Sequence, residues 1–146
     1  MAPIHFHYID QLFHFPKRTG LKDFLVKLAK AEGYKVAGVN YIFCDDAYLL
    51  EINRSHLNHD TYTDIITFPY NLSGQPIQSE IYISVERVRE NAAGFGVPFL
   101  EELHRVIFHG LLHLCGYKDK TKADQKAMRS REDYWLKQYS RSTWNG

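Results

Sequence analysis

The chain has 146 residues, of which 45% are apolar and 14% aromatic. This length and composition allow one substantial hydrophobic core and exclude a wholly disordered chain. The formal net charge is only +1, so global charge gives no argument for a nucleic-acid partner. Because the sequence contains no repeat, low-complexity tract or linker, we predict a single domain over residues 1–146.

The N-terminal stretch MAPIHFHYIDQLF lacks the basic start, long apolar run and cleavage site of a secretory signal. No apolar run approaches the roughly 20 residues that a membrane-spanning helix needs. The only cysteines, Cys44 and Cys115, are too few for a disulfide framework and suit a reducing compartment. We therefore expect a cytoplasmic protein that does not associate with a membrane, in which both thiols are packing residues.

The first part of the chain predicts strands and helices in alternation. Residues 4–9 alternate apolar and polar side chains, as a half-buried strand does. The apolar stripe from Leu21 to Ala29 predicts an amphipathic helix that Gly33 is placed to end. Residues 35–44 are rich in β-forming side chains and predict a strand, and residues 47–55 predict a helix.

The next segment predicts an antiparallel strand pair followed by a helix. Residues 63–68, TDIITF, read as a short strand that Pro69 stops, and residues 80–84 read as the next strand, with turn residues between them. Ser84 is placed to cap a helix that runs through about Ala93.

Two longer helices complete the chain. The first has Pro98 in its first turn and ends before Gly116, and the second covers about residues 123–139. We expect the last helix to present its apolar face to the core through Ala127, Met128, Tyr134, Trp135 and Tyr139. The predicted architecture is mixed α/β (α+β), with a four-stranded mixed sheet and five helices.

Residues 109–119, HGLLHLCGYKD, carry the strongest sign of chemistry. His109 and His113 are i, i+4 neighbours on the Pro98 helix, so both imidazoles can face one ion. Gly116 can adopt a positive φ and turn the chain out of the helix, which brings Asp119 back as a third ligand. Three protein ligands with one open position are typical of a catalytic zinc site, although a bare H-x-x-x-H also arises often by chance.

The residues around this motif narrow its interpretation. Gly110 stands where H-E-x-x-H peptidases carry their general base, which argues against a peptidase. Cys115 is turned about 200° from His113 on a helix, and His104 is similarly off the face of His109, so neither is predicted to be a ligand.

These residues resemble the signature of the YbeY family, H-G-x-L-H-L-x-G-Y-D-H. His109, Gly110, Leu112, His113, Leu114, Gly116 and Tyr117 match it. Upstream, TDIITFP at 63–69 resembles the family's T-D-V-L-S-F-P, and SEIYIS at 79–84 resembles G-D-I-x-I-S. The resemblance therefore extends from Asn53 to at least Asp119.

The resemblance implies a metal-dependent endoribonuclease that acts on single-stranded RNA during 16S ribosomal RNA maturation and ribosome quality control. It also implies ribosomal subunits and assembly factors as partners. We expect one zinc ion held by His109, His113 and Asp119 to polarise a phosphoryl oxygen and to activate water. No general base is obvious: Asp64 or Glu80 could supply one if their strands border the cleft, but each suits the role of a cap or surface acid equally well. The choice between hydrolysis and attack by the 2′-OH is also open.

The chain departs from the family pattern at three places. Asp119 replaces a histidine of the family signature. The negative charge of a carboxylate ligand should weaken the activation of bound water and favour harder ions than zinc, so another divalent metal is an alternative. Asp124 is a second candidate ligand, at a less suitable spacing. Leu57 falls where many members carry an arginine, with Arg54 the only nearby substitute. Ser79-Glu80 replaces Gly-Asp, a change we expect to be tolerated.

Basic and aromatic residues supply candidate RNA contacts. From Lys118 to the end of the chain there are eight Lys or Arg against four acids, so we consider Arg54, Lys118, Lys120 and Lys122 as phosphate contacts. The alternative is a solvated helix face with mixed charges. The candidate base-stacking aromatics are Tyr62, Phe68, Tyr70 and Tyr117, although most aromatic residues of the chain must belong to the core. His56 and His59 are expected to be surface residues.

Two other functions stay open from the sequence. One is a different metal-dependent hydrolase, such as a peptidase. The other is a ribosome-associated binding module with a weakly catalytic or structural metal. Structural zinc prefers four protein ligands, usually with cysteine among them, whereas only three are plausible here, and this favours an open site.

Overall fold

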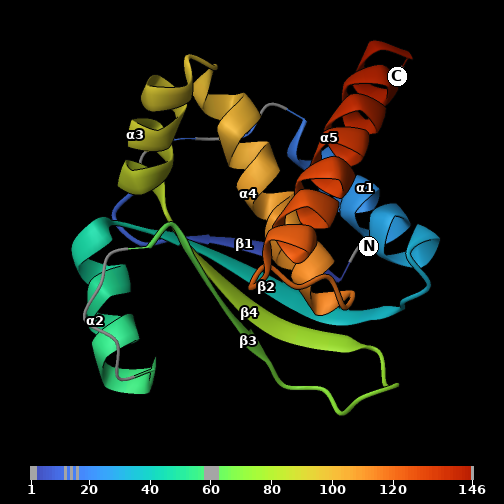
Figure 1. The fold of residues 1–146 in the computed structure, drawn as a ribbon, viewed down its shortest axis with the longest axis horizontal. Helices are drawn as coiled ribbons and strands as arrows, with labels where there is room; N and C mark the ends of the chain where they lie inside the picture. Colours follow the sequence, from blue (N-terminus) through green and yellow to red (C-terminus); the bar gives the residue numbers. More distant parts are fainter. Residues whose placement is uncertain (1–2, 12, 14, 16, 58–62, 146) are drawn as a thin grey trace.

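The computed structural model describes residues 3–11, 13, 15, 17–57 and 63–145, and the side chains of these residues through 142 (Figure 1). The predicted His59 and Tyr62 lie outside this part of the chain. In chain order the elements are β1 (Ile4–Tyr8), α1 (Arg18–Ala31), β2 (Val36–Cys44), α2 (Asp46–Leu57), β3 (Ile65–Pro69), β4 (Ile77–Ser84), α3 (Val85–Phe95), α4 (Phe99–Leu114) and α5 (Lys122–Asn145). Every helix in the described segments is too short or too polar to cross a lipid bilayer.

The four strands form one mixed sheet in the order β1-β2-β4-β3. β2 runs parallel to both β1 and β4, whereas β3 runs antiparallel to β4, with Ile65 opposite Ile83. The predicted mixed sheet and its antiparallel pair are therefore confirmed. The parallel pairing of β2 with β4 leaves β3 at the edge of the sheet.

Some predicted boundaries were wrong, for identifiable reasons. Pro69 does not stop β3 but is its last residue, because an edge strand tolerates a residue without an N–H donor. β4 begins at Ile77 rather than at residue 80, since its first residues already pair with β2. Pro98 lies at the N-cap of α4 rather than inside its first turn. α5 continues to Asn145 instead of ending near Tyr139.

Figure 1 shows the helices α1, α4 and α5 over one face of the sheet, and the main core lies between them and that face. Alternate residues of β2, namely Val39, Tyr41 and Phe43, point into this core. The Tyr41 hydroxyl donates a hydrogen bond to the carbonyl oxygen of Ile107 at 3.1 Å and so joins β2 to the middle of α4. On the other face, α2 covers a smaller cluster around Cys44, Leu49 and Ile66.

The last helix buries a narrower stripe than the sequence predicted. Met128, Trp135 and Tyr139 are buried, but Ala127 and Tyr134 are exposed. Predicting these two as packing residues was wrong, because the stripe follows Met128, Glu132, Trp135 and Tyr139 at helical spacing and includes an acid. The burial of Glu132 on this stripe becomes important at the functional site.

Gly110 allows α4 to approach the sheet closely. A Cβ at this position would lie 2.9 Å from Cδ1 of Ile65 and 3.2 Å from Cγ2 of Ile81. Gly110 therefore faces the sheet rather than the solvent. The position that carries the general base in H-E-x-x-H peptidases here serves the close packing of the α4 backbone against the sheet.

Replacing Gly110 with valine should destabilise the fold by about 2 kcal/mol, because the added methyl groups overpack the α4–sheet contact. The matched variant is Gly94→Val in α3, where no atom lies within 4 Å of an added Cβ. That variant should change stability by less than about 0.5 kcal/mol. Denaturant unfolding of both variants measures the difference, and equal stabilities would contradict the close approach.

Glu32 joins the end of α1 to α5. Its carboxylate accepts hydrogen bonds from Arg131 Nε at 3.1 Å, Trp135 Nε1 at 2.9 Å and the Tyr117 hydroxyl at 2.9 Å. Burial alone would raise the pKa of Glu32, but these hydrogen bonds outweigh it and hold the pKa below its ordinary value. The ionised form is therefore the one that the fold stabilises.

Glu32→Gln should lower the free energy of unfolding at neutral pH by about 2 kcal/mol, the range of charge-assisted hydrogen bonds. Because the folded-state pKa is lowered, the native advantage is fully present above the unfolded-state pKa and is lost as pH falls through the folded-state pKa. Urea unfolding of both chains between neutral and acidic pH tests this. A difference that did not shrink on acidification would contradict it. Glu51→Gln, an exposed acid on α2, is the control.

Candidate metal centre and adjoining cavities

The chain leaves α4 by the predicted glycine turn. Gly116 has a φ of 99°, its N–H donates to the carbonyl oxygen of His113, and the N–H of Tyr117 donates to that of Leu112. This pair of bonds is a Schellman motif, for which glycine is the favoured residue. Gln125 from α5 then donates to the backbone oxygen of Asp119 at 3.1 Å. These contacts return Asp119 to the face of α4 that carries His109.

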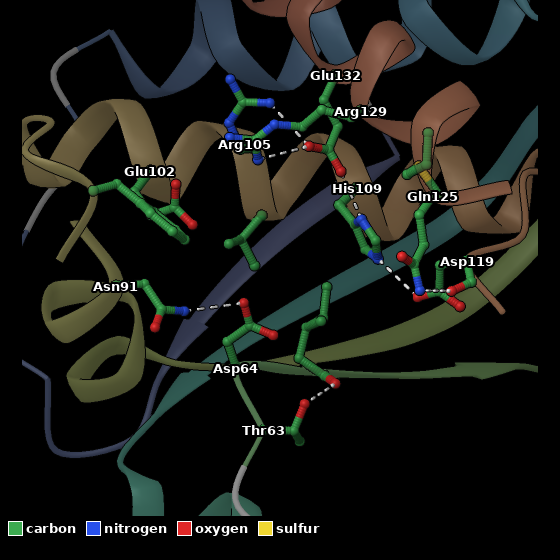
Figure 2. Close-up of a pocket in the computed structure, with 14 residues that line it drawn as sticks. Thr63, Asp64, Asn91, Glu102, Arg105, His109, Asp119, Gln125, Arg129 and Glu132 are labelled. Atoms are coloured by element: carbon green, nitrogen blue, oxygen red, sulfur yellow. Dashed lines mark hydrogen bonds and ion pairs between the residues drawn. The ribbon is translucent and has the colours of Figure 1, made fainter. Parts of the chain in front are cut away.

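His109 is held between two carboxylates. Its Nδ1 lies 2.7 Å from Oε2 of Glu132, and its Nε2 lies 3.6 Å from Oδ2 of Asp119 (Figure 2). In the neutral tautomer that this arrangement favours, Nδ1–H donates to Glu132 and Nε2 is free to bind a metal. Two ligands of a tetrahedral zinc lie about 3.4 Å apart, given bond lengths near 2.1 Å. The donor chemistry of His109 and Asp119 therefore fits a metal ion.

His113 has the same tautomer preference. Its Nδ1 lies 3.0 Å from the carbonyl oxygen of Tyr117, which leaves Nε2 free. His109, His113 and Asp119 all line one cavity of about 340 Å³. Within the described segments, however, no three His, Cys, Asp or Glu side chains come together as a metal-binding group. The structure thus presents two predicted ligands in contact and the third in the same cavity, not a closed set of three.

Glu132 holds His109 in position and is itself held by Arg105. Its side chain is 6% exposed and also accepts from Arg105 Nη1 at 2.9 Å, while Arg105 Nη2 donates to Asp133. Burial alone would lower the pKa of His109, but the hydrogen bond and charge of Glu132, with the charges of Asp64 and Asp119, raise it above its ordinary value. Glu132 therefore orients His109 and increases its basicity.

Sequence reasoning missed Glu132, Arg105 and Glu102, all of which line the larger of the two cavities together with His109. For Glu132 a signal existed in the sequence. It lies four residues after Met128 and three before Trp135, on the apolar stripe of α5. An acid on a buried helix face usually has a partner.

The two candidate general bases, Asp64 and Glu80, line different cavities in the structure. Asp64 lines the larger cavity together with His109, and burial raises its pKa despite the opposing charge of His109. Glu80 instead accepts a hydrogen bond from the Tyr70 hydroxyl at 2.6 Å and lines a separate cavity with Phe68. Asp64 is therefore the candidate that the fold brings to the site.

The predicted RNA-contacting cations lie outside the two cavities. Arg54, Lys118, Lys120 and Lys122 are exposed and line neither of them. Contact of these four residues with a phosphate backbone stays a prediction. Leu57 lines the smaller cavity with the two histidines, so the departure from arginine lies at the site itself.

The remaining sequence candidates have structural roles. Asp124 forms a capping box with Thr121, since its N–H donates to the Thr121 hydroxyl and its carboxylate accepts from the Thr121 N–H. His104 stacks on Phe15 and Phe108 and meets Tyr139 edge-on, and burial lowers its pKa to about 4. Cys44 and Cys115 are buried free thiols, and burial raises the pKa of each to about 12.

The remaining aromatic candidates also have partners away from the two cavities. The Tyr117 hydroxyl donates to Glu32, and His56 is an exposed surface residue that contacts Phe68. Phe68 and Tyr70 line the separate cavity beside Glu80.

A histidine–carboxylate pair beside a cavity, on a helix that packs against a mixed sheet, is compatible with the class of metal-dependent hydrolases. Comparison with known proteins gives the family. The family model for endoribonuclease YbeY matches residues 13–140. The chain belongs to the YbeY family.

Relatives and a solved structure agree with this assignment. The chain is 54% identical to endoribonuclease YbeY of Flavobacterium psychrophilum over 86% of this chain and 89% of the relative. It is 49% identical to endoribonuclease YbeY of Flavobacterium johnsoniae over 89% and 92%. The solution structure of TM1509 from Thermotoga maritima superposes with a TM-score of 0.64 at 28% identity, covering 97% of this chain and 91% of that one. The similarity spans most of the described fold.

Proposed function

We propose that the chain is a zinc-dependent endoribonuclease that cuts single-stranded RNA in the maturation of 16S ribosomal RNA and in ribosome quality control. The observation that supports this proposal most strongly is the environment of His109, whose Nδ1 is held by Glu132 and whose Nε2 faces Asp119. Family membership supports RNA cleavage and a metal requirement. The family also supports ribosomal subunits and assembly factors as partners and the cytoplasm as the location.

His109, His113 and Asp119 would hold the ion. A divalent cation bound there supplies Lewis-acid stabilisation of phosphoryl charge and lowers the pKa of a bound water. Glu132 and the Tyr117 carbonyl each hold an Nδ1 proton and keep Nε2 of the adjacent histidine available. Asp64, whose pKa burial raises, would be a stronger base than an ordinary aspartate and could accept a proton either from water or from a 2′-OH.

The shape of the site supports a single-stranded substrate. The cavity with His113 and a larger one of about 440 Å³ share Thr63, Ile65, His109 and Asp119, so they form one continuous depression along the β3 edge. A single strand can turn an unstacked base into such a depression, whereas a paired base is held in its duplex.

The substrate class is tested with fluorescent oligoribonucleotides of one 16S-derived sequence, presented single stranded, as a duplex, and as the matching DNA. We expect metal-dependent cutting of the single-stranded RNA at least tenfold faster than of the duplex. A peptide library is the control for the hydrolase alternative. Equal cutting of single strand and duplex, or cleavage of peptides, would contradict the proposal; tight binding of ribosomal subunits without any cutting would favour the binding module.

Asp119→His should shift the metal preference toward zinc by about tenfold relative to manganese. The neutral imidazole leaves one more positive charge on the ion and is a softer donor than a carboxylate. Cleavage rates with each metal at saturation measure this ratio. Asp124→His, in the capping box of α5, is the control, and an unchanged ratio for Asp119→His would argue against Asp119 as a ligand.

A further inference from the structure

The larger cavity contains an acidic recess whose residue Glu102 takes no part in the proposed metal chemistry. It extends from His109 between α3, α4, α5 and β3, and Figure 2 shows Glu102 and Asn91 on the side away from Asp119. Glu102, Asp64, Asn91, Phe95 and Val106 are among its lining residues. We call this part of the cavity the Glu102 recess.

Glu102 is a buried charge without a partner in the described part of the chain. The residue is 5% exposed, and no described residue makes a hydrogen bond or ion pair with its carboxylate. The nearest cation on its own helix, Arg105, donates instead to Glu132 and Asp133. Burial raises the pKa of Glu102, although the charge of Arg105 opposes the shift. The carboxylate faces the open cavity instead of a protein partner, and this calls for an explanation.

The fold itself does not supply that explanation. Glu102 lies in the first turn of α4, where acids favour the helix dipole, but Glu101 in the same turn is exposed and serves the dipole without burial. Pro98 at the N-cap has no N–H for a capping-box bond. The buried carboxylate is therefore available to a ligand.

The chemistry of the recess selects among ligands. A second metal ion is disfavoured by the guanidinium groups of Arg105 and Arg129, which line the same cavity. A phosphate is disfavoured, because the acids Asp64, Glu102 and Glu132 outnumber the cations Arg105 and Arg129 among the lining residues. The recess instead suits a neutral, partly apolar group that donates hydrogen bonds.

A guanine base matches this description. A carboxylate presents two adjacent acceptor oxygens, and guanine is the one common RNA base whose Watson–Crick edge presents two adjacent donors, N1–H and the N2 amino group. Phe95, 60% exposed at the recess, offers a ring on which a base can stack, and Val106 and Met128 add apolar wall. We propose that Glu102 recognises a guanine of the RNA next to the phosphate held at His109.

This inference rests on the proposed function for its substrate, but its test does not require cleavage. Guanosine, inosine and adenosine 5′-monophosphates carry the same phosphate and contain no internucleotide bond. Their binding to the metal-loaded full chain is measured by calorimetry. We expect guanosine monophosphate to bind about tenfold more tightly than the other two, within the range of a bidentate base contact, since inosine lacks the N2 amino group and adenosine lacks both donors.

The decisive variant is Glu102→Gln, which keeps the shape and replaces one acceptor by a donor. We expect it to lose the preference for guanosine monophosphate over inosine monophosphate, while the matched variant Glu101→Gln keeps the preference. Phe95→Ala should weaken all three ligands by a similar factor, because stacking is indifferent to the base. Thermal unfolding of each variant checks that the fold is intact.

Two results would overturn the assignment: equal binding of the three nucleotides by the native chain, or a guanine preference that persists in Glu102→Gln. A failure of the proposed function appears differently, as an absence of oligonucleotide cleavage with the nucleotide preference intact. Cleavage without any guanine preference would leave the proposed function standing and remove the recess assignment.

Discussion

His113→Ala should reduce RNA cleavage by more than about 100-fold, beyond the roughly 10–100-fold range that changes outside the ligand shell produce. The residue supplies Nε2 to the cavity that also contains His109 and Asp119, and its Nδ1 is already engaged by the Tyr117 carbonyl. Since His113 is exposed, its removal leaves the core of α4 unchanged. Initial rates on a single-stranded oligoribonucleotide at saturating metal measure the loss.

His5→Ala on β1 is the control for this experiment. His5 is also an exposed histidine, but it lines neither cavity at the site. Its variant should cut RNA at the native rate. If His113→Ala retained more than a tenth of native activity while folded, His113 would not be a ligand.

Glu132→Gln should reduce cleavage by roughly 10–100-fold at limiting metal, the usual effect of losing a carboxylate behind a metal-binding histidine. Glutamine can still accept the Nδ1–H of His109, so the ring orientation survives in part. The lost charge lowers the basicity of Nε2 and weakens metal affinity. Much of the activity should therefore return when the metal concentration is raised.

Asp133→Asn provides a matched comparison with Glu132→Gln. Asp133 also accepts from Arg105, at 2.7 Å, but it is exposed and does not contact His109. Its variant should keep the native dependence of rate on metal concentration. A Glu132→Gln rate that metal cannot raise, or one identical to that of Asp133→Asn, would refute the role of Glu132 behind His109.

Local sequence patterns predicted the elements that carry the site. The i, i+4 spacing places His109 and His113 one turn apart on α4, and the positive φ of Gly116 returns the chain as expected. These features depend on backbone geometry over a few residues, which the sequence encodes directly. The antiparallel β3–β4 pair was predictable for the same reason, because few residues connect the two strands.

What the sequence did not reveal depends on contacts between distant segments. Glu132 reaches His109 across 23 positions, and the angle at which α5 crosses α4 decides this contact. Glu102 and Phe95 meet in one recess only because α3 packs against α4. Neither arrangement follows from periodicity within one element. Glu132, an acid on the buried stripe of α5, was the one local sign in the sequence, and it pointed only to its own contact with His109.

The most direct test of the metal-dependent cleavage is a titration of the chelator-treated native chain with zinc, measuring bound metal and RNA cleavage in the same samples. We expect both to rise together and to reach a plateau near one ion per chain. We also expect His113→Ala to bind less metal and to stay inactive throughout. Full cleavage by a chain without bound metal, or equal cleavage by His113→Ala, would contradict the assignment of this site.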